Sequence, residues 1–238
     1  MSAPTYRPMR FGVTHVTTRD TPDGVRYVRA AQDLQPYPTR LTDRLAHWAH
    51  TTPDQTWMAQ RVKNADGSLG DWRHVTYAQA WQSARNIAQA LLGMHLSAER
   101  PVAILSENDL DHALLSLGCL VAGVPQCTVS TAYSTISQDF DKLRHVVESL
   151  TPGLVFASSG ERFGRAITAT MGPDVHVVLG SGSIPGRATI PFSDLLNTPA
   201  TPAVDAAHAT ITSDHIAKFM FTSGSTKLPK AVVVTHGM

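Results

Sequence analysis

The sequence predicts an α/β fold in which a layered, parallel-rich sheet carries helices on both of its faces. Three observations lead to this prediction. Between residues 101 and 180, short apolar runs alternate with segments whose apolar residues have helical spacing. The apolar runs are almost continuous, as in strands that are buried on both faces. Polar or glycine-containing turns separate the segments. Such alternation favours parallel pairing through right-handed crossovers.

Residues 1–40 are predicted to form an N-terminal arm that carries a β-hairpin. Two β-prone runs, 13–18 and 25–30, flank a Pro-Asp-Gly sequence that ends at Gly24. Proline presets φ and glycine accepts a positive φ, so this sequence favours a turn. The Pro-Tyr-Pro sequence at 36–38 then separates the arm from the main body.

The next segment is predicted to contain a helix, a strand pair and a second helix. The first helix spans 41–50, and the strands span 56–62 and 72–75. The second helix begins at Thr76, where a glutamine three residues later completes a capping box. It is expected to end at the glycine at position 93.

From residue 101 the alternation of strands and helices gives the elements of the sheet. The expected strands are 101–105, 124–129, 153–157 and 175–180, and the expected helices are 110–122, 136–150 and 161–171. The polar segments 106–109 and 128–133 should lie at the carboxyl ends of strands, where ligands bind in such sheets. Either segment could instead serve only to cap a helix, and this structural role is the favoured interpretation. Residues 181–186 are predicted to be a surface turn, and 195–213 an exposed connection.

The last residues contain the most informative pattern. Two apolar runs, 216–221 and 231–234, flank a loop with four hydroxyl side chains around a glycine: Thr222, Ser223, Gly224, Ser225 and Thr226. Backbone N–H groups in such a turn can form an anion-binding concavity, hydroxyls add donors, and Lys230 adds a point charge. It is not a Walker A loop, because a strand follows it in place of a helix. By composition alone, a polar hairpin loop is the favoured interpretation, because Ser, Thr, Gly and Pro are common turn residues.

Composition excludes several other classes of protein. The chain has 238 residues, 42% of them apolar, and a net charge of +1, so nothing suggests a nucleic-acid or membrane-surface partner. No secretory signal or apolar stretch long enough for a membrane span is present, so the cytoplasm is expected. Cys119 and Cys127 are predicted to be buried. His47 and His50 are predicted to be solvated rather than metal ligands.

The order of residues in the terminal loop adds a family resemblance. Thr-Ser-Gly-Ser-Thr-x-x-Pro-Lys, then an apolar run and Thr-His, closely resembles the phosphate-binding loop of the adenylate-forming superfamily. This superfamily includes acyl- and aryl-CoA synthetases, firefly-type luciferases and peptide-synthetase adenylation domains. The sequence departs from the usual pattern at Lys227 and Ala231, where glycine is common. Segments 41–54, 75–78, 102–108 and 129–134 also resemble the family. The arm most resembles feruloyl-CoA synthetases, which act on hydroxycinnamates in phenylpropanoid metabolism.

The resemblance implies a ligase with ATP, Mg²⁺ and coenzyme A, which forms an acyl-adenylate from an aromatic or aliphatic carboxylate and transfers the acyl group to coenzyme A. It implies phosphate binding by Thr222, Ser223, Gly224, Ser225, Thr226, Lys227 and Lys230, with Lys230 and Thr226 as the catalytic candidates. His236 orients the next segment or is structural. The implied subdomains are 41–210 and a truncated one at 211–238. We expect a fragment that is inactive alone. A carrier-protein acceptor, a non-catalytic nucleotide- or partner-binding module and a homo-oligomer stay open.

Overall fold

The computed structural model describes residues 12, 14–64, 66–222 and 228–238, and it divides the chain into two units. Unit 1 is Met1–Tyr37, and unit 2 is Pro38–Met238. In unit 1, β1 (Val16–Asp20) pairs antiparallel with β2 (Arg26–Ala30). The turn between them contains Gly24 at a φ of 84°, so the predicted hairpin and its glycine are confirmed.

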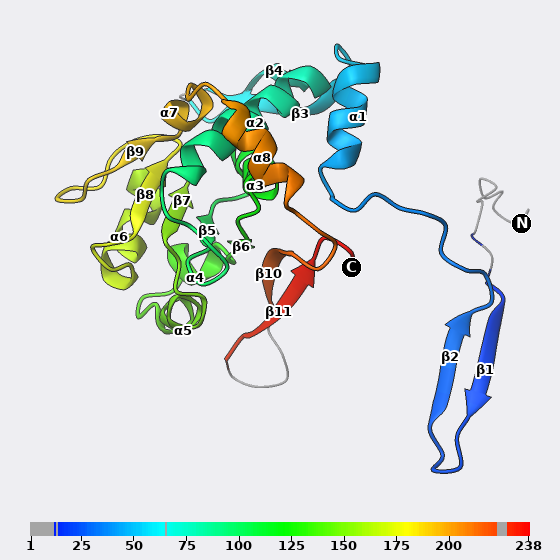
Figure 1. Ribbon diagram of the computed structural model, residues 1–238. Helices are drawn as coiled ribbons and strands as arrows, with labels where there is room; N and C mark the ends of the chain where they lie inside the picture. Colours follow the sequence, from blue (N-terminus) through cyan, green and yellow to red (C-terminus); the bar gives the residue numbers. More distant parts are fainter. Residues whose placement is uncertain (1–11, 13, 65, 223–227) are drawn as a thin grey trace, which may run out of the picture. The chain divides into compact units, whose positions relative to one another are not determined.

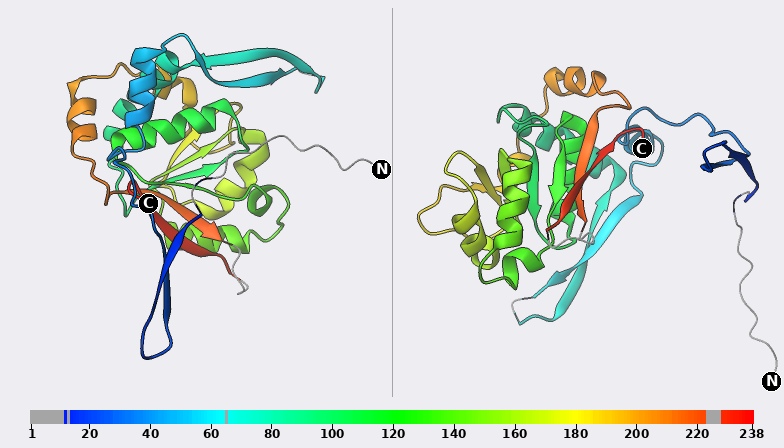
Figure 2. Two further views of the ribbon diagram at one scale, coloured as in Figure 1. Left: turned by 90° about the vertical axis from the view of Figure 1, so that its right-hand side faces the viewer. Right: turned by 90° about the horizontal axis from the view of Figure 1, so that it is seen from below.

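Unit 2 is built on a seven-stranded sheet, shown in Figure 1. Its strand order is β11-β10-β6-β5-β7-β8-β9. The strands are β5 (Val102–Leu105), β6 (Gln126–Thr128), β7 (Leu154–Ala157), β8 (His176–Leu179), β9 (Ile190–Pro191), β10 (Ile216–Thr222) and β11 (Lys230–Thr235). All neighbours pair in parallel except β10 and β11, which are antiparallel. Figure 2 shows β10 in orange and β11 in red side by side.

The apolar strands separate two buried clusters, one on each face of the sheet. Val102 and Ile104 of β5 belong to one cluster, whereas Ala103 and Leu105 belong to the other. The first cluster includes residues of α2 (Tyr77–Leu92), α3 (Leu110–Ala122), α7 (Phe192–Leu196) and α8 (Pro202–Ala209). The second includes residues of α5 (Asp141–Leu150) and α6 (Gly160–Thr170). The predicted fold class is therefore confirmed, with helices on both faces.

Two of the predicted helices begin and end as the sequence indicates. α2 begins after Thr76, whose hydroxyl accepts from the Gln79 backbone N–H at 3.2 Å, while the Gln79 side chain accepts from the Thr76 N–H at 2.9 Å. α3 is capped by Asp109 and ends at Gly123, which has a φ of 71°. The capping box and the glycine stop set these boundaries because they satisfy or replace the free backbone groups of helix ends.

The remaining elements of unit 2 lie outside the sheet. α1 (Asp43–Thr51) precedes a two-stranded ribbon of β3 (Thr56–Lys63) and β4 (Leu69–Thr76). α4 (Ala132–Thr135) follows β6.

Two segments depart from the sequence prediction by more than small shifts at the ends of elements. The helix expected over 136–150 begins only at Asp141, because Phe140 has a φ of 60° and its N–H donates to the Ser137 hydroxyl in a turn. The expected connection over 195–213 contains α8. Thr201 caps this helix, and Val204 is fully buried. The Ala-, Thr- and Pro-rich composition of residues 195–213 hid this helix, which tertiary packing stabilises.

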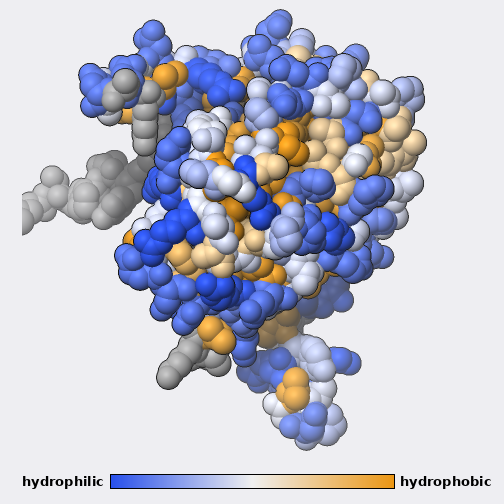
Figure 3. Space-filling model, turned by 90° about the vertical axis from the view of Figure 1, so that its left-hand side faces the viewer, coloured by the Kyte–Doolittle hydropathy of each residue, from blue (hydrophilic) through white to orange (hydrophobic). Residues whose placement is uncertain are grey.

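The face of the molecule in Figure 3 is largely hydrophilic, with apolar residues exposed in separate patches. Among the residues that the structure describes, no helix has the length and apolar character needed to cross a bilayer.

Candidate functional site

The hydroxyl-rich segment predicted to bind phosphate connects two paired strands. Thr222 at the end of β10 and Lys230 at the start of β11 form the pair that borders the segment. The Thr222 hydroxyl donates a hydrogen bond of 3.5 Å to the Lys230 carbonyl. Both residues are exposed. The two predicted strands are therefore confirmed, and they hold the ends of the segment together.

The structure brings together two of the seven predicted site residues, Thr222 and Lys230. The other five lie outside the described residues: Ser223, Gly224, Ser225, Thr226 and Lys227. The phosphate-binding roles of all seven residues, and the catalytic roles of Thr226 and Lys230, stay predictions.

The end of β10 at Thr222 lies at the carboxyl edge of the parallel strands. β10 runs parallel to β6, with Phe219 in register with Cys127. The carboxyl ends of β5 and β6 border a cavity of about 590 Å³. It is lined by Ser106, Glu107, Asn108, Thr128, Val129, Ser130 and Thr131. Both polar segments predicted at this edge therefore line one cavity, in the position where such sheets bind ligands.

The first of these segments also has the structural role favoured from the sequence. The Asp109 carboxylate accepts from the His112 backbone N–H at 2.7 Å and so caps α3. The buried Ser106 donates its hydroxyl hydrogen bond to the same carboxylate. Capping therefore accounts for Asp109 and Ser106, while Glu107 and Asn108 remain on the cavity wall.

His112 joins the two polar segments, and the sequence reasoning missed it. Its Nδ1 lies 3.0 Å from the Glu107 carbonyl, and its Nε2 lies 3.1 Å from the Thr128 hydroxyl oxygen. A carbonyl only accepts hydrogen bonds, so Nδ1 carries the proton and Nε2 accepts from Thr128 in the neutral ring. The one feature of the sequence that could have indicated His112 is its position in the first turn of the helix that follows the polar residues 106–109.

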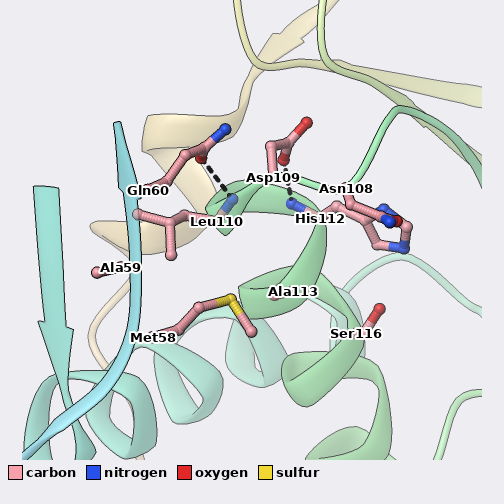
Figure 4. Close-up of a pocket in the computed structure, with 9 residues that line it drawn as sticks. All are labelled: Met58, Ala59, Gln60, Asn108, Asp109, Leu110, His112, Ala113 and Ser116. Carbon is pink, nitrogen blue, oxygen red and sulfur yellow. Dashed lines mark hydrogen bonds between the residues drawn. The ribbon is translucent and has the colours of Figure 1, made fainter. Parts of the chain in front are cut away.

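His112 also borders a cavity of about 410 Å³ between β3 and α3, shown in Figure 4. The lining is Met58, Ala59, Gln60, Asn108, Asp109, Leu110, His112, Ala113 and Ser116. The Gln60 side-chain oxygen accepts from the Leu110 N–H at 3.0 Å, which links the ribbon to the first turn of α3. The cavity combines a mainly apolar wall with a few polar groups, the usual chemistry of a small-molecule site.

A smaller cavity of about 200 Å³ lies between α3, β6 and β10. Lys218 and Gln126 are neighbours in register on its wall. Gln126 is buried, and its side-chain oxygen has no hydrogen-bond partner among the described residues. This cavity therefore presents a cation and an unpaired acceptor close to the residues that precede the hydroxyl-rich segment.

His145 holds the far end of the hydroxyl-rich segment. Its Nε2 lies 2.9 Å from the carbonyl oxygen of the buried Pro229, directly before β11. Because a carbonyl accepts, Nε2 must carry a proton. α5 places His145 there by burying Leu143 and Val146 against the sheet. Nothing in the sequence pattern indicated this contact.

His236 has a structural role at the end of β11. Only 4% of it is exposed, and its Nδ1 accepts from the Leu41 backbone N–H at 3.2 Å. The backbone N–H of His236 donates to the His215 backbone carbonyl at 3.0 Å. Burial lowers the pKa of His236, and the nearby His215 and His208 lower it further. The ring is therefore neutral and fixes the chain after β11 to the residues before α1.

Neither cysteine fits the role of a nucleophile. Cys119 and Cys127 are buried and unpaired. Burial raises the pKa of both thiols, that of Cys127 to about 12. Both thiols are therefore protonated near neutral pH, and the predicted role as small buried residues is confirmed. Within the described ranges, no group of three or more His, Cys, Asp or Glu side chains could hold a metal ion.

Comparison with known proteins identifies curated relatives. The chain is 25% identical over 150 residues to a 4-hydroxybenzoate–CoA/benzoate–CoA ligase of Rhodopseudomonas palustris. This match covers 63% of the chain and 26% of that protein. It is 24% identical over 207 residues to fatty acyl-CoA synthetase B of Dictyostelium discoideum. This second match covers 82% of the chain and 30% of that protein. The chain therefore spans less than a third of the length of these relatives.

The fold is also similar to a solved structure, and a family model matches most of the chain. A fatty acyl-adenylate ligase from L. pneumophila, solved with acyl adenylate and pyrophosphate, has a TM-score of 0.58 and 23% identity. The match covers 83% of this chain and 30% of that one. The model that describes AMP-binding enzymes matches residues 45–238. Together with the parallel-rich sheet and the strand pair that borders the hydroxyl-rich segment, this match places the chain in the AMP-binding enzyme family.

Proposed function

We propose that the chain is the N-terminal part of an ATP-dependent ligase that activates a carboxylate as an acyl-adenylate and transfers the acyl group to coenzyme A. The observation that carries the proposal is the β10–β11 strand pair. It places the ends of the hydroxyl-rich segment, Thr222 and Lys230, next to each other at the carboxyl edge of the sheet. Family membership supports the same activity.

The chemistry of the first step explains why such a segment is needed. A carboxylate must attack the α-phosphate of ATP, and both reactants are anions that repel each other. Backbone N–H groups and hydroxyls donate hydrogen bonds to the β- and γ-phosphates, and the Lys230 ammonium group offsets part of their charge. Together they hold the leaving pyrophosphate in line with the attacking oxygen. The same groups stabilise the charge that develops on the departing pyrophosphate. Lys230 is exposed at the start of β11, so its ammonium group is accessible to phosphate.

The substrate and the acceptor are inferred from the relatives. The two curated relatives carry names of coenzyme A ligases, one for hydroxybenzoate or benzoate and one for fatty acids. These names support coenzyme A over a carrier protein as the thiol acceptor. Within this range we favour an aryl acid, and a hydroxycinnamate such as ferulate in particular, because the arm at residues 1–40 resembles feruloyl-CoA synthetases.

Mg²⁺ is proposed to enter with the nucleotide. Mg²⁺ in nucleotide sites is held largely by phosphate oxygens and water, with one or two protein carboxylates. When bound, it neutralises phosphate charge alongside Lys230.

The same proposal covers subdomains and compartment. We infer that 41–210 forms one subdomain and that 211–238 begins the next subdomain of a longer protein, because the matches cover only 26% and 30% of the curated relatives. Two unpaired, buried cysteines are compatible with a reducing compartment, which supports the cytoplasm.

The test is the Lys230→Ala variant of the complete enzyme, assayed by pyrophosphate release with Mg-ATP. The acids are benzoate, 4-hydroxybenzoate, ferulate and a fatty acid, with coenzyme A as acceptor. A charged hydrogen bond is worth about 1.5–3 kcal/mol, so we expect about a 10- to 100-fold loss of kcat/KM. Lys142→Ala is the matched control, because this exposed lysine contacts the Tyr133 ring and lies on α5.

The outcomes separate the residue from the function. Unchanged pyrophosphate release by Lys230→Ala would remove Lys230 from the mechanism and leave the ligase proposal intact. Absence of acid-dependent pyrophosphate release by the unaltered enzyme, with every acid of the panel, would reject the ligase proposal itself.

A further inference from the structure

Two polar side chains lie next to each other on interior strands of the sheet and face α3. Gln126 of β6 and Lys218 of β10 are in register, and adjacent strands lie about 4.7–4.9 Å apart. Val102 of β5 is in register with Gln126 and belongs to the buried cluster that includes α3. Residues in register share one face of a sheet, so both polar side chains are on the α3 side. β6 and β10 each have a paired strand on both sides.

Gln126 contributes a buried acceptor that has no partner. The residue is 8% exposed, and no group among the described residues donates to its side-chain oxygen. A buried acceptor without a hydrogen bond is costly, and native structures contain few of them. Gln126 lines the cavity of about 200 Å³ between α3, β6 and β10. The occupant that satisfies this oxygen therefore has to enter the cavity and donate a hydrogen bond.

Lys218 contributes a donor with a full positive charge to the same cavity. The residue is half-buried, and no carboxylate that the structure describes forms an ion pair with it. Its ammonium group can only donate hydrogen bonds, so the occupant also has to accept one. A hydroxyl group meets both demands with a single oxygen atom. An ionised carboxylate only accepts and leaves the Gln126 oxygen unpaired.

The size and the other walls of the cavity favour an aromatic ring as the body of the occupant. A water molecule takes up about 30 Å³ in the liquid, so this cavity is too large for a single water. It is smaller than the usual ligand pocket of about 300–1,000 Å³, which limits the occupant to one ring. Met220 lines the cavity, and its thioether makes favourable contacts with aromatic rings. His112 and Ser116 of α3 line both this cavity and the larger one in Figure 4.

We propose that this cavity binds a small neutral phenol. The phenol O–H donates to the Gln126 side-chain oxygen, the phenol oxygen accepts from the Lys218 ammonium group, and the ring packs on Met220. Nε2 of His112 already accepts from the Thr128 hydroxyl, so it does not compete for the phenol proton. A phenol with a pKa near the value of about 10 for tyrosine keeps that proton at neutral pH. Binding requires neither ATP nor coenzyme A.

The first experiment compares three probes by fluorine NMR with the complete enzyme, in the absence of ATP and coenzyme A. They are 4-fluorophenol, 4-fluorotoluene and 4-fluorobenzoate. The toluene has a methyl group where the phenol has its hydroxyl, and it should bind about 10-fold or more weakly because Gln126 and Lys218 stay unpaired. The benzoate cannot donate to Gln126 and should show the same loss. Binding is assigned to this cavity where Gln126→Leu or Lys218→Met weakens it.

The second experiment examines these two variants. Each should weaken the binding of 4-fluorophenol about 10-fold or more, because a buried hydrogen bond is lost. Gln126→Leu should also raise the melting temperature of the enzyme without ligand, since it removes an unpaired buried acceptor, whereas loss of a structural glutamine would lower it. The matched controls are Gln82→Leu on α2 and Lys142→Met on α5, which replace exposed residues and should leave binding unchanged.

Three results would overturn the proposal. No binding of 4-fluorophenol at millimolar concentration would mean that the cavity holds only water. Equal affinities for the phenol and the toluene would mean that the two polar groups do not recognise a hydroxyl. Tighter binding of 4-fluorobenzoate, lost in Lys218→Met, would mean that the site takes anions and that the Gln126 amide turns its N–H group towards them. Since no turnover is measured, each of these results leaves the ligase proposal standing.

Discussion

Two histidines fix the chain at either side of β11, although both are far in sequence from their partners. His145 contacts the Pro229 carbonyl before the strand, and His236 accepts from the Leu41 N–H after it. Each contact links β11 to a different part of unit 2, α5 in one case and the residues before α1 in the other. At the scale of single residues, therefore, the position of the candidate phosphate segment depends on His145, which lies outside the family motif, as well as on His236 at the end of that motif.

His145→Ala should weaken ATP binding more than it slows the chemical step. The loss of one hydrogen bond, about 1 kcal/mol, corresponds to about a fivefold increase in the KM for ATP in the complete enzyme, with kcat little changed. His145→Gln retains an N–H donor near Nε2 and should restore most of the affinity. Steady-state kinetics with ATP as the varied substrate measure both parameters. An equal defect in the alanine and glutamine variants would contradict the positioning role.

The buried His236 should make stability depend on pH in the mildly acidic range. Its pKa in the folded chain lies below the ordinary value of 6.5 because burial disfavours the charged ring. The unfolded chain then binds more protons, so stability is present above pH 6.5 and is lost as the pH falls through the folded pKa. Burial also lowers the pKa of the neighbouring His208, which acts in the same direction.

His236→Asn tests this prediction because its amide oxygen can accept from the Leu41 N–H without titrating. Melting temperatures measured between pH 8 and pH 5 should fall less steeply for the variant than for the unaltered chain. Identical slopes would show that other groups cause the loss of stability.

At the scale of elements, the close contact of α2 with α3 depends on one glycine. A Cβ added to Gly118 of α3 would lie 2.3 Å from Cγ2 and 2.6 Å from Cβ of the fully buried Ile87 of α2. Real Cβ contacts are never this short, so any larger residue must move one helix. α3 carries Asp109 and His112 at its first turn, and a shift of the helix would therefore disturb the cavities at the carboxyl edge.

Gly118→Ala should lower the free energy of unfolding by about 1–3 kcal/mol through this overpacking. Ile87→Ala alone should cost about 2–5 kcal/mol, because it removes buried methyl groups and leaves a cavity. The double variant should cost less than the sum of the two, since the smaller side chain makes room for the new methyl group. Urea denaturation measures all three values.

Gly93→Ala is the control, because its nearest neighbour lies at 3.6 Å and its φ is −81°. It should change stability by less than about 1 kcal/mol. Additive costs for Gly118 and Ile87 would show that these residues do not share the contact.

At the scale of the whole molecule, folding and catalysis have different requirements. Unit 2 has a sheet that is covered on both faces and two buried clusters, which are the features of a stable α/β domain. By contrast, the chain spans only 26% and 30% of the length of its two curated relatives. A stable fold is therefore compatible with a chain that spans only part of the length of its relatives.

We expect the purified 238-residue chain to unfold cooperatively but to form no acyl-adenylate. Circular dichroism on heating measures the first, and mass spectrometry after incubation with Mg-ATP and an aryl acid measures the second. The complete enzyme at the same molar concentration is the positive control. Acyl-adenylate formed by the 238-residue chain would contradict the expectation that this chain is inactive alone.

The order of strands and helices was largely predictable, because it depends on local patterns. Apolar runs, the Thr76 capping box and the glycine after α3 determined their elements by local physics. The predicted helix over 136–150 was wrong at its start, since the left-handed φ of Phe140 has no local signal. α8 was missed because it depends on burying Val204 against the other helices.

The sequence by itself determined the fold class, the hydroxyl-rich segment between two strands and the family resemblance, because these depend on the order of neighbouring residues. Only the tertiary structure determined that His145 meets Pro229, that Leu41 meets His236 and that Gln126 lies beside Lys218. The two histidine contacts join residues that are 84 and 195 positions apart in the sequence. Gln126 and Lys218 lie on neighbouring parallel strands that a long connection separates. These contacts depend on how the elements pack, and side-chain spacing along the chain carries no information about that packing.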